Sequence, residues 1–345
     1  MSRCRGLRGH EGCWHIGLMN RRHFIADTAA LTALAFLGFR NGLSAQTAGG
    51  ASGPAAPAVA MPGTTPAATA LKTEFVPLRR NVGIFNGRGG TIGWLSNADA
   101  LAVVDTQFPE TATVCLAGLP GRGERMLDVV INTHHHGDHV GGNAVFRPAT
   151  KKLVAHANVP ELMKARAIQD KKPVENLVIA DTTFAETWTM ELGDEVVSAR
   201  YFGAAHTKGD IVVLFEKANV VHMGDLLFNR IYPVIDRPGG ASIEGWIGVL
   251  EKIAKDYPAD AIYVAGHANP KFSVTVERAQ LLVLRDYLTG LLEYTQKEIA
   301  AGKAKSEIAA LENLPGFPDF HQALPNRLGI NLSVAYDELT VGALK

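Results

Sequence analysis

A cluster of histidines at positions 134–139 constrains this chain most. It reads His-His-His-Gly-Asp-His and directly follows an apolar run at residues 127–132. Such a run is typical of a buried strand, and functional residues commonly lie in the loops at strand ends. A loop leaving this strand can direct His134 and His136 at one metal ion, while Asp138 and His139 reach a second. Imidazole and carboxylate together suit zinc, which imposes no geometry of its own.

Short apolar runs alternate with helical patterns along the rest of the chain. Strands are expected at residues 82–85, 91–95, 100–105, 127–132, 153–156, 183–189, 196–202, 211–215 and 220–222. Helices are expected at residues 109–119, 243–256 and 274–300, with one or two helical turns at 140–146. This order fits an α/β (α+β) fold arranged as a four-layered αβ/βα sandwich, although the order of elements does not by itself identify that fold.

The spacing H-x-H-x-D-H at 134–139 resembles the metallo-β-lactamase superfamily. Three further segments resemble the metal motifs of that family in the same order along the chain. They are residues 203–210, which contain His206, residues 222–225, which end in Asp225, and residues 265–267, which end in His267. Each follows an apolar strand-like run. The resemblance covers roughly residues 75–268 and implies the metallo-β-lactamase fold.

The resemblance also implies a ligand set for two zinc ions. One ion would be held by His134, His136 and His206, the other by Asp138, His139 and His267, with Asp225 bridging the two. Iron and manganese stay open as alternatives. Many β-lactamases of the family have cysteine where this chain has Asp225. The aspartate resembles the glyoxalase II, lactonase and phosphodiesterase branches instead.

Two zinc ions lower the pKa of a shared water toward 7, so hydroxide forms without a separate strong base. The chain is therefore expected to hydrolyse an ester, lactone, thioester or amide/β-lactam bond of a small-molecule substrate. Asp138 is the candidate to accept or relay the proton. Residues 226–240 follow Asp225 and are predicted to form a loop that lines the substrate pocket through Asn229 and Tyr232, with a purely structural loop as the alternative.

Several other polar residues are expected to have supporting or structural roles. His135 is expected to face solvent or to support the ligands beside it, and His222 to be a hydrogen-bonded core residue or a partner of a ligand. Asp210 and Thr207 are expected to orient His206 or brace its loop. Cys115 lies in a predicted helix and is expected to be a buried apolar residue rather than a nucleophile.

The N-terminal residues 1–45 are predicted to be a twin-arginine export signal. Arg21 and Arg22 precede an apolar stretch that runs to about Phe39, which is shorter than the roughly 20 residues that a membrane span needs. Cleavage is expected after Ala45. The mature chain would then be periplasmic or secreted, without stable membrane insertion. An uncleaved anchor is one alternative, and a true start at Met19 is another.

Beyond the signal, residues 46–70 are almost wholly Ala, Gly, Pro, Ser and Thr and are predicted to be a disordered linker. The catalytic domain is expected to cover residues 71–345. The first 45 residues carry six of the 34 basic and two of the 34 acidic side chains, so 28 basic and 32 acidic remain, a formal charge of −4. Such a body binds polyanions poorly, which argues against a nucleic-acid partner and a nuclease.

Two further hypotheses share this fold. One is a di-iron or mono-iron redox enzyme. The flavodiiron branch generally has glutamate where this chain has His136, so the nitrogen-rich ligand set favours zinc. The other is an accessory metalloprotein of a periplasmic quinoprotein or sulfur-oxidation system. The sequence does not specify the oligomeric state.

Overall fold

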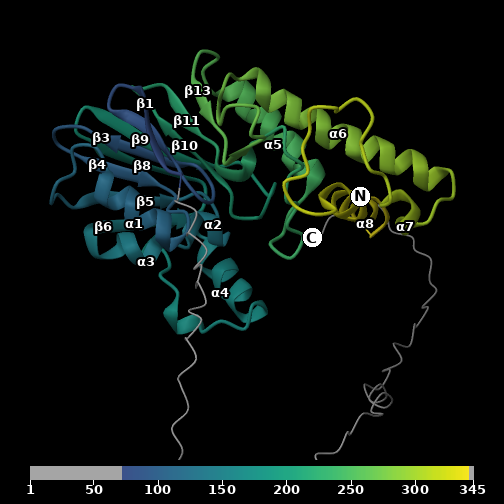
Figure 1. Cartoon of the computed structure of the whole chain (residues 1–345), viewed down its shortest axis with the longest axis horizontal. Helices are drawn as coiled ribbons and strands as arrows, with labels where there is room; N and C mark the ends of the chain where they lie inside the picture. The colour runs from purple at the N-terminus through teal and green to yellow at the C-terminus, as the bar shows by residue number, and fades with distance from the viewer. Residues whose placement is uncertain (1–71, 342–345) are drawn as a thin grey trace, which may run out of the picture. The chain divides into compact units, whose positions relative to one another are not determined.

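The computed structural model describes residues 72–341. The predicted export signal at 1–45 and the predicted linker at 46–70 therefore lie outside the described residues. Within the described part, two β-sheets lie between helices (Figure 1). None of the helices in this part is long and apolar enough to span a membrane.

The first sheet contains seven strands in sequence order. They are β1 (Glu74–Arg79), β2 (Val82–Asn86), β3 (Ile92–Ser96), β4 (Leu101–Val104), β5 (Leu127–Asn132), β6 (Thr150–His156) and β7 (Thr182–Phe184). Strands β1 to β4 are antiparallel, and β4 to β7 are parallel. Because β4 and β5 are parallel, the residues that follow them emerge at the same edge of the sheet.

The second sheet contains six strands in the order β15-β13-β11-β10-β9-β8. They are β8 (Thr187–Leu192), β9 (Glu195–Tyr201), β10 (Ile211–Phe215), β11 (Val220–His222), β13 (Ile262–Val264) and β15 (Thr275–Val276). Strands β11 and β13 are parallel neighbours, so their carboxyl ends also share one edge. Two short strands, β12 (Phe228–Asn229) and β14 (His267–Ala268), pair with each other in parallel beyond that edge.

Eight α-helices are described in residues 72–341. They are α1 (Pro109–Gly118), α2 (Gly137–Val140), α3 (Asn143–Phe146), α4 (Val159–Gln169), α5 (Ile243–Asp256), α6 (Ala279–Ala300), α7 (Lys305–Ile308) and α8 (Arg327–Val341). Short 3-10 turns occur at η1 (Arg147–Ala149), η2 (Val174–Asn176) and η3 (Gly224–Leu226). Helix α5 begins at an N-cap, Ser242, whose side chain accepts a hydrogen bond from the Gly245 amide.

Three apolar clusters separate the layers. Alternate residues of β4 show this directly, because side chains alternate between the two faces of a strand. Val104 packs with Val213 between the two sheets, whereas Val103 packs with Cys115 between the first sheet and α1. On the outer face of the second sheet, a larger cluster includes Trp246 of α5 and residues of α6 and α8. The predicted four-layered αβ/βα sandwich is confirmed, and Cys115 is buried among apolar residues as expected.

Two predicted elements differ from the structure. The single strand expected at 183–189 is two strands, because the chain leaves the first sheet after β7 and enters the second at β8. The helix expected at 274–300 begins at Ala279. The residues before it are extended, since Thr275 and Val276 pair with β13. Strand β1 and helices α4 and α8 were not predicted.

The unpredicted helix α8 contributes a buried carboxylate to the start of α5. The two carboxylate oxygens of Glu338 accept hydrogen bonds from the backbone amides of Ile243 at 3.0 Å and Glu244 at 3.1 Å. Ser242 Oγ and Arg237 Nη1 each lie 3.1 Å from the same carboxylate. Glu338 therefore satisfies amides that a helix start leaves unpaired and places a negative charge there, where the helix dipole favours it.

Replacing Glu338 with alanine is expected to lower the free energy of unfolding by about 2 to 4 kcal/mol, because buried amides and Arg237 lose a charged acceptor. Urea denaturation followed by circular dichroism measures the change. The matched control is Asp337→Asn on the same helix, whose partner Lys305 is half-exposed, and which should cost less than about 1 kcal/mol. Equal losses of unfolding free energy in the two variants would show that Glu338 stabilises the start of α5 no more than an exposed carboxylate would.

Candidate metal centre

The predicted ligands come from loops at the carboxyl ends of strands in both sheets. His134 lies just beyond β5, and Asp138 and His139 lie in the single turn α2 that follows. From the second sheet, His206 lies between β9 and β10, and Asp225 lies in the turn η3 after β11. His267 begins β14 after β13. The parallel pairing of β11 with β13 explains why the last two segments meet.

His134, His136, His206 and Asp225 form the first group of donor atoms, which all lie within 4.8 Å of one another. His206 Nε2 lies 2.9 Å from His136 Nδ1. The Oδ2 atom of Asp225 lies 3.5 Å from His206 Nε2 and 3.8 Å from His134 Nε2. The predicted ligands of one ion therefore converge in the structure.

Asp138, His139 and His267 form the second group. His267 Nε2 lies 3.1 Å from Asp138 Oδ2 and 3.4 Å from His139 Nε2. The other oxygen of Asp225, Oδ1, lies 3.0 Å from His139 Nε2 and 3.4 Å from His267 Nε2. Asp225 thus directs one carboxylate oxygen at each group, which is the arrangement expected of a bridging ligand.

The donor set fits a metal ion better than a closed hydrogen-bond network. His134 is buried, and its Nε2 atom has no hydrogen-bond partner among the described residues. Burial, followed by the nearby His139, lowers the pKa of His134 well below its usual range. Burial and His136 lower the pKa of His206 to about 3. Both imidazoles are therefore neutral at pH 7, the form that binds a metal.

The carboxylates of the centre are ionised. Burial raises the pKa of Asp225, but His139 and His267 outweigh it and hold that pKa well below the usual range. Burial likewise raises the pKa of Asp138, while a hydrogen bond from His267 and the charge of His139 bring it to about 2. Burial lowers the pKa of His139 and of His267, but the nearby carboxylates, chiefly Asp225, outweigh it and raise both. Without a metal ion, the ionised carboxylates are therefore paired with protonated imidazoles, and a metal ion at the second group would displace those protons.

Asp105, immediately after β4, supports the second group and was not predicted. Its Oδ2 atom accepts hydrogen bonds from His139 Nδ1 and Thr133 Oγ1, each at 2.7 Å, and its Oδ1 atom accepts one from the Thr133 amide at 2.7 Å. The bond to Nδ1 leaves His139 Nε2 free to face the centre. The one available signal in the sequence was a carboxylate at the end of a buried apolar run.

Other ligands are oriented in the same way. His206 Nδ1 donates to the carbonyl of Val234 at 2.7 Å, which leaves Nε2 for the centre. His136 directs Nδ1 at the centre and places Nε2 2.9 Å from Asp236 Oδ2. Two glycines make room, because a Cβ at Gly90 would collide with the His139 ring and one at Gly266 with Asp225.

The other polar residues expected to support the centre are all buried, but they contact different partners. Asp210 accepts hydrogen bonds from the amide and hydroxyl of Thr207, each at 2.7 Å, and so braces the loop beside His206. His222 is buried and contacts the carbonyl of Thr91 at 3.0 Å, as a core histidine does. His135 is buried rather than solvent-facing, and its Nε2 atom lies 3.4 Å from Asp236.

The two predicted substrate-contacting residues are buried. Asn229 donates to the carbonyl of Ser273 at 2.8 Å. Tyr232 is only 3% exposed, and its ring packs against Tyr287 and Phe320 in the outer core. These contacts are those of a structural loop, the alternative stated for residues 226–240. Phe228 of the same segment lies nearer the chemistry, with its ring stacked on His267.

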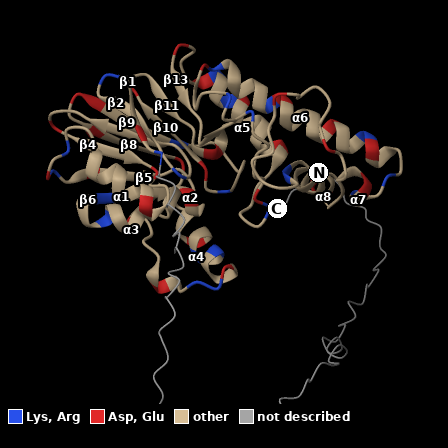
Figure 2. Ribbon diagram, viewed as in Figure 1, with Lys and Arg blue, Asp and Glu red and all other residues tan. Residues whose placement is uncertain are grey.

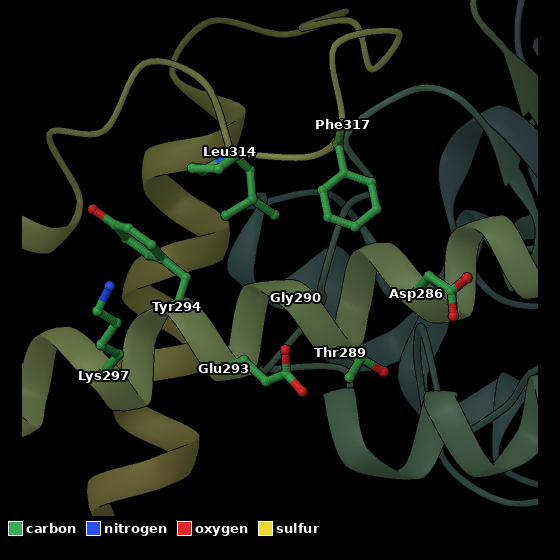
Figure 3. Close-up of a pocket in the computed structure, with 9 residues that line it drawn as sticks. Asp286, Thr289, Gly290, Glu293, Tyr294, Lys297, Leu314 and Phe317 are labelled. Atoms are coloured by element: carbon green, nitrogen blue, oxygen red, sulfur yellow. The ribbon is translucent and has the colours of Figure 1, made fainter.

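A groove of about 480 Å³ lies elsewhere, along α6 and the segment that follows α7. Figure 3 shows Tyr294, Leu314 and Phe317 around it, with Gly290 at its floor. None of its lining residues is a predicted metal ligand. The groove is therefore separate from the candidate metal centre.

In this αβ/βα sandwich, two groups of histidine and aspartate donors lie at the ends of strands and share one carboxylate. This arrangement defines a metal-binding protein of the β-lactamase-like architecture. The model of the metallo-beta-lactamase superfamily matches residues 86–267, more than half of the chain. The chain belongs to this superfamily. The match begins in β2 and ends at the last predicted ligand, so α6 to α8 lie beyond it.

Curated relatives include proteins named hydroxyacylglutathione hydrolase and proteins named metallo-beta-lactamase. A hydroxyacylglutathione hydrolase from Methylococcus capsulatus is 32% identical over 52% of this chain. A type 2 metallo-beta-lactamase from Elizabethkingia meningoseptica is 26% identical over 50% of this chain. The chain spans 62% of the length of each of these two relatives.

Solved structures share the fold. A metallo-beta-lactamase from Pontibacter korlensis has a TM-score of 0.51 and 20% identity, covering 63% of this chain and 99% of its own. A stereoselective inverting sec-alkylsulfatase from Pseudomonas sp. has a TM-score of 0.62 and 15% identity, covering 77% of this chain and 50% of its own. The sulfatase structure covers more of this chain than the β-lactamase structure does. The fold is therefore shared with the sulfatase over a longer part of this chain.

Asp105→Asn is expected to weaken metal binding about 10- to 100-fold, because the amide cannot accept from all three of its present donors. Asn tolerates the left-handed backbone of this position, where φ is 64°, so the fold should persist. Competition with a chromophoric chelator measures the affinity, and circular dichroism checks the fold. Unchanged affinity in a folded variant would remove Asp105 from its supporting role.

The raised pKa of Asp210 predicts that the stability of the fold depends on pH. Burial raises the pKa of Asp210 from 3.8 to about 8, despite the hydrogen bonds from Thr207. Between about pH 4 and pH 8 the unfolded chain releases a proton that the folded protein retains. The free energy of unfolding therefore falls as pH rises, by up to about 1.4 kcal/mol per pH unit, and levels off above pH 8.

Asp210→Asn removes this titration and keeps an acceptor for Thr207, so its stability should decline less over the same range. Urea denaturation of the zinc-free wild type and variant at about pH 5, 6.5 and 8 provides the comparison. The zinc-free form is used because bound metal would add its own pH dependence. Parallel pH profiles would contradict the assignment.

Proposed function

We propose that this chain is a dinuclear zinc hydrolase that cleaves an ester, lactone, thioester or amide bond of a small molecule. The arrangement of Asp225 carries the proposal, because its two oxygens face two separate groups of donors. Membership of the metallo-beta-lactamase superfamily and the names of the curated relatives support it.

Zinc fits the donor types of both groups, which are imidazole nitrogens and carboxylate oxygens. The first group offers neutral imidazoles, whereas zinc binding at the second would release protons from His139 and His267. The ligands would be His134, His136 and His206 for one ion and Asp138, His139 and His267 for the other, with Asp225 shared. Bound zinc would polarise the carbonyl group of a substrate and lower the pKa of a water molecule.

The protein's own residues supply proton transfer and order. Asp138 is ionised, with a pKa of about 2, and its side chain is 29% exposed, more than that of any other ligand carboxylate. Its exposure makes Asp138 the candidate to relay a proton at Oδ2 toward a leaving group, and its low pKa means that it would hold the proton only transiently. His267 lies 3.1 Å from that oxygen and holds its orientation. Asp105 and Thr133 keep the neighbouring His139 fixed from behind.

Thioesters are the first substrate class to test. The relative from Methylococcus capsulatus is named for hydrolysis of an acylated glutathione, and it is more similar to this chain than the β-lactamase from Elizabethkingia meningoseptica. Export to the periplasm or medium by the twin-arginine route remains part of the proposal. It is supported by Arg21, Arg22 and the apolar stretch after them.

The zinc-loaded protein should hydrolyse at least one member of a panel of acylglutathione thioesters, lactones, simple esters and β-lactams. Chelation should reduce turnover by roughly 100-fold or more, and added zinc should restore it. Asp225→Ala should lose turnover to a similar extent and bind less zinc. Asp256→Ala, which removes a partly exposed carboxylate on α5, is the matched control and should behave as wild type.

Chelator-insensitive turnover would contradict the mechanism. Zinc-loaded protein that hydrolyses no member of the panel would favour the accessory-metalloprotein hypothesis. Metal analysis of the purified protein distinguishes zinc from iron or manganese.

A further inference from the structure

A third group of donor atoms lies on the far side of the His136 ring from the main centre. His136 directs Nδ1 at His206 and Nε2 at Asp236, at 2.9 Å in both cases. His135, the next residue back along the chain, also directs its Nε2 atom at Asp236 Oδ2, at 3.4 Å. The three residues offer ligand atoms that all lie within 4.8 Å of one another.

We propose that His135, His136 and Asp236 form a third, weaker zinc site that shares the His136 ring with the main centre. The proposal rests on the proposed function only in that the main centre must also hold zinc for the ring to be shared. Tetrahedral zinc with ligands at about 2.0 to 2.2 Å places neighbouring ligand atoms roughly 3.3 to 3.5 Å apart. The separations of 2.9 and 3.4 Å resemble those within the main centre.

The ring of His135 is held beside Asp236 with little access to solvent. The residue is only 4% exposed, its Nε2 atom lies 3.4 Å from Asp236 Oδ2, and its Nδ1 atom makes no hydrogen bond within residues 72–341. Both histidines direct a ring nitrogen at the same oxygen of Asp236, while its Oδ1 atom accepts from the Gly239 amide at 3.1 Å. A zinc ion between the rings and Oδ2 would bind both nitrogens at once. The proton of His136 Nε2 would leave to solvent.

A small cavity gives access to this group. It has a volume of about 50 Å³, enough for a water molecule to complete the coordination, and His135, Asp236 and Gly239 line one side. Arg166 and Gln169 of α4 line the other. Acidic and basic side chains both occur along α4 (Figure 2). The positive charge of Arg166 opposes a cation here, and this makes the third site weaker than the main centre.

Occupation of the third site would disturb the main centre through the shared ring. Zinc at Nε2 would replace the hydrogen bond from His136 to Asp236 and place a second cation on the ring that binds the main centre. The two cations would repel each other across the ring, and His136 would lose the bond that orients it. Zinc in excess of two equivalents should therefore inhibit hydrolysis.

Native mass spectrometry during stepwise zinc addition tests the proposal. The wild-type protein should bind two ions tightly and a third at least about tenfold more weakly. His135→Asn should lose the third ion and retain two, whereas His321→Asn, which removes an exposed histidine, should bind three. Arg166→Gln should bind the third ion about three- to tenfold more tightly, because a repelling charge is gone.

Saturation of the wild type at two ions would overturn the proposal, as would three ions on His135→Asn. The Arg166→Gln variant provides an independent test if His135→Asn fails to fold, since a purely structural role for the group predicts no tightening. Two ions with full hydrolysis would refute the third site alone. Three ions without hydrolysis of any substrate would refute the proposed function and leave the third site standing.

Discussion

The buried carboxylate of Asp225 is the group on which the rest of the structure depends. It is 3% exposed, and an isolated buried charge is strongly unfavourable. Four imidazoles surround it, two facing each oxygen. Those imidazoles come from both sheets of the sandwich. Compensating one charge therefore requires that the strand ends of the two sheets meet at a fixed position.

Backbone hydrogen bonds between the two halves hold that position. The Thr91 amide at the start of β3 donates to the carbonyl of Gly266 at 2.9 Å, and the Ile211 amide at the start of β10 donates to Thr133 at 3.0 Å. His222 completes the link from β11 to Thr91. These contacts lie directly behind the ligands. The centre is therefore built on the joint between the sheets rather than on flexible loops alone.

Much of this arrangement could be predicted from the sequence, because the ligands belong to compact motifs at strand ends. His134, His206 and Asp225 each follow an apolar run, and that local pattern places them at one edge. Asp210 and Thr207 could be predicted as supporting residues because they lie beside His206 in the chain, but two other supporting residues could not be found in this way. Asp105 and Asp236 lie far along the chain from the histidines that they contact, and a lone aspartate near a turn has many structural explanations.

The errors in the predicted elements have a similar physical origin. Residues 183–189 alternate as one strand would, and nothing local signals that the chain changes sheets after Phe184. Helix α8 is stabilised by contacts made at long range, including Glu338 with the start of α5. Tyr232 was predicted to line the pocket because its segment follows Asp225, and in the structure its ring packs against Tyr287 and Phe320.

The C-terminal part of the chain, which lies beyond the family match, fixes the segment that follows Asp225. The Tyr232 amide donates to the carbonyl of His321, Asn331 donates to that of Pro233, and Arg237 pairs with Glu338. A change in the segment after Asp225 must therefore be accommodated by side chains about one hundred residues further along the chain.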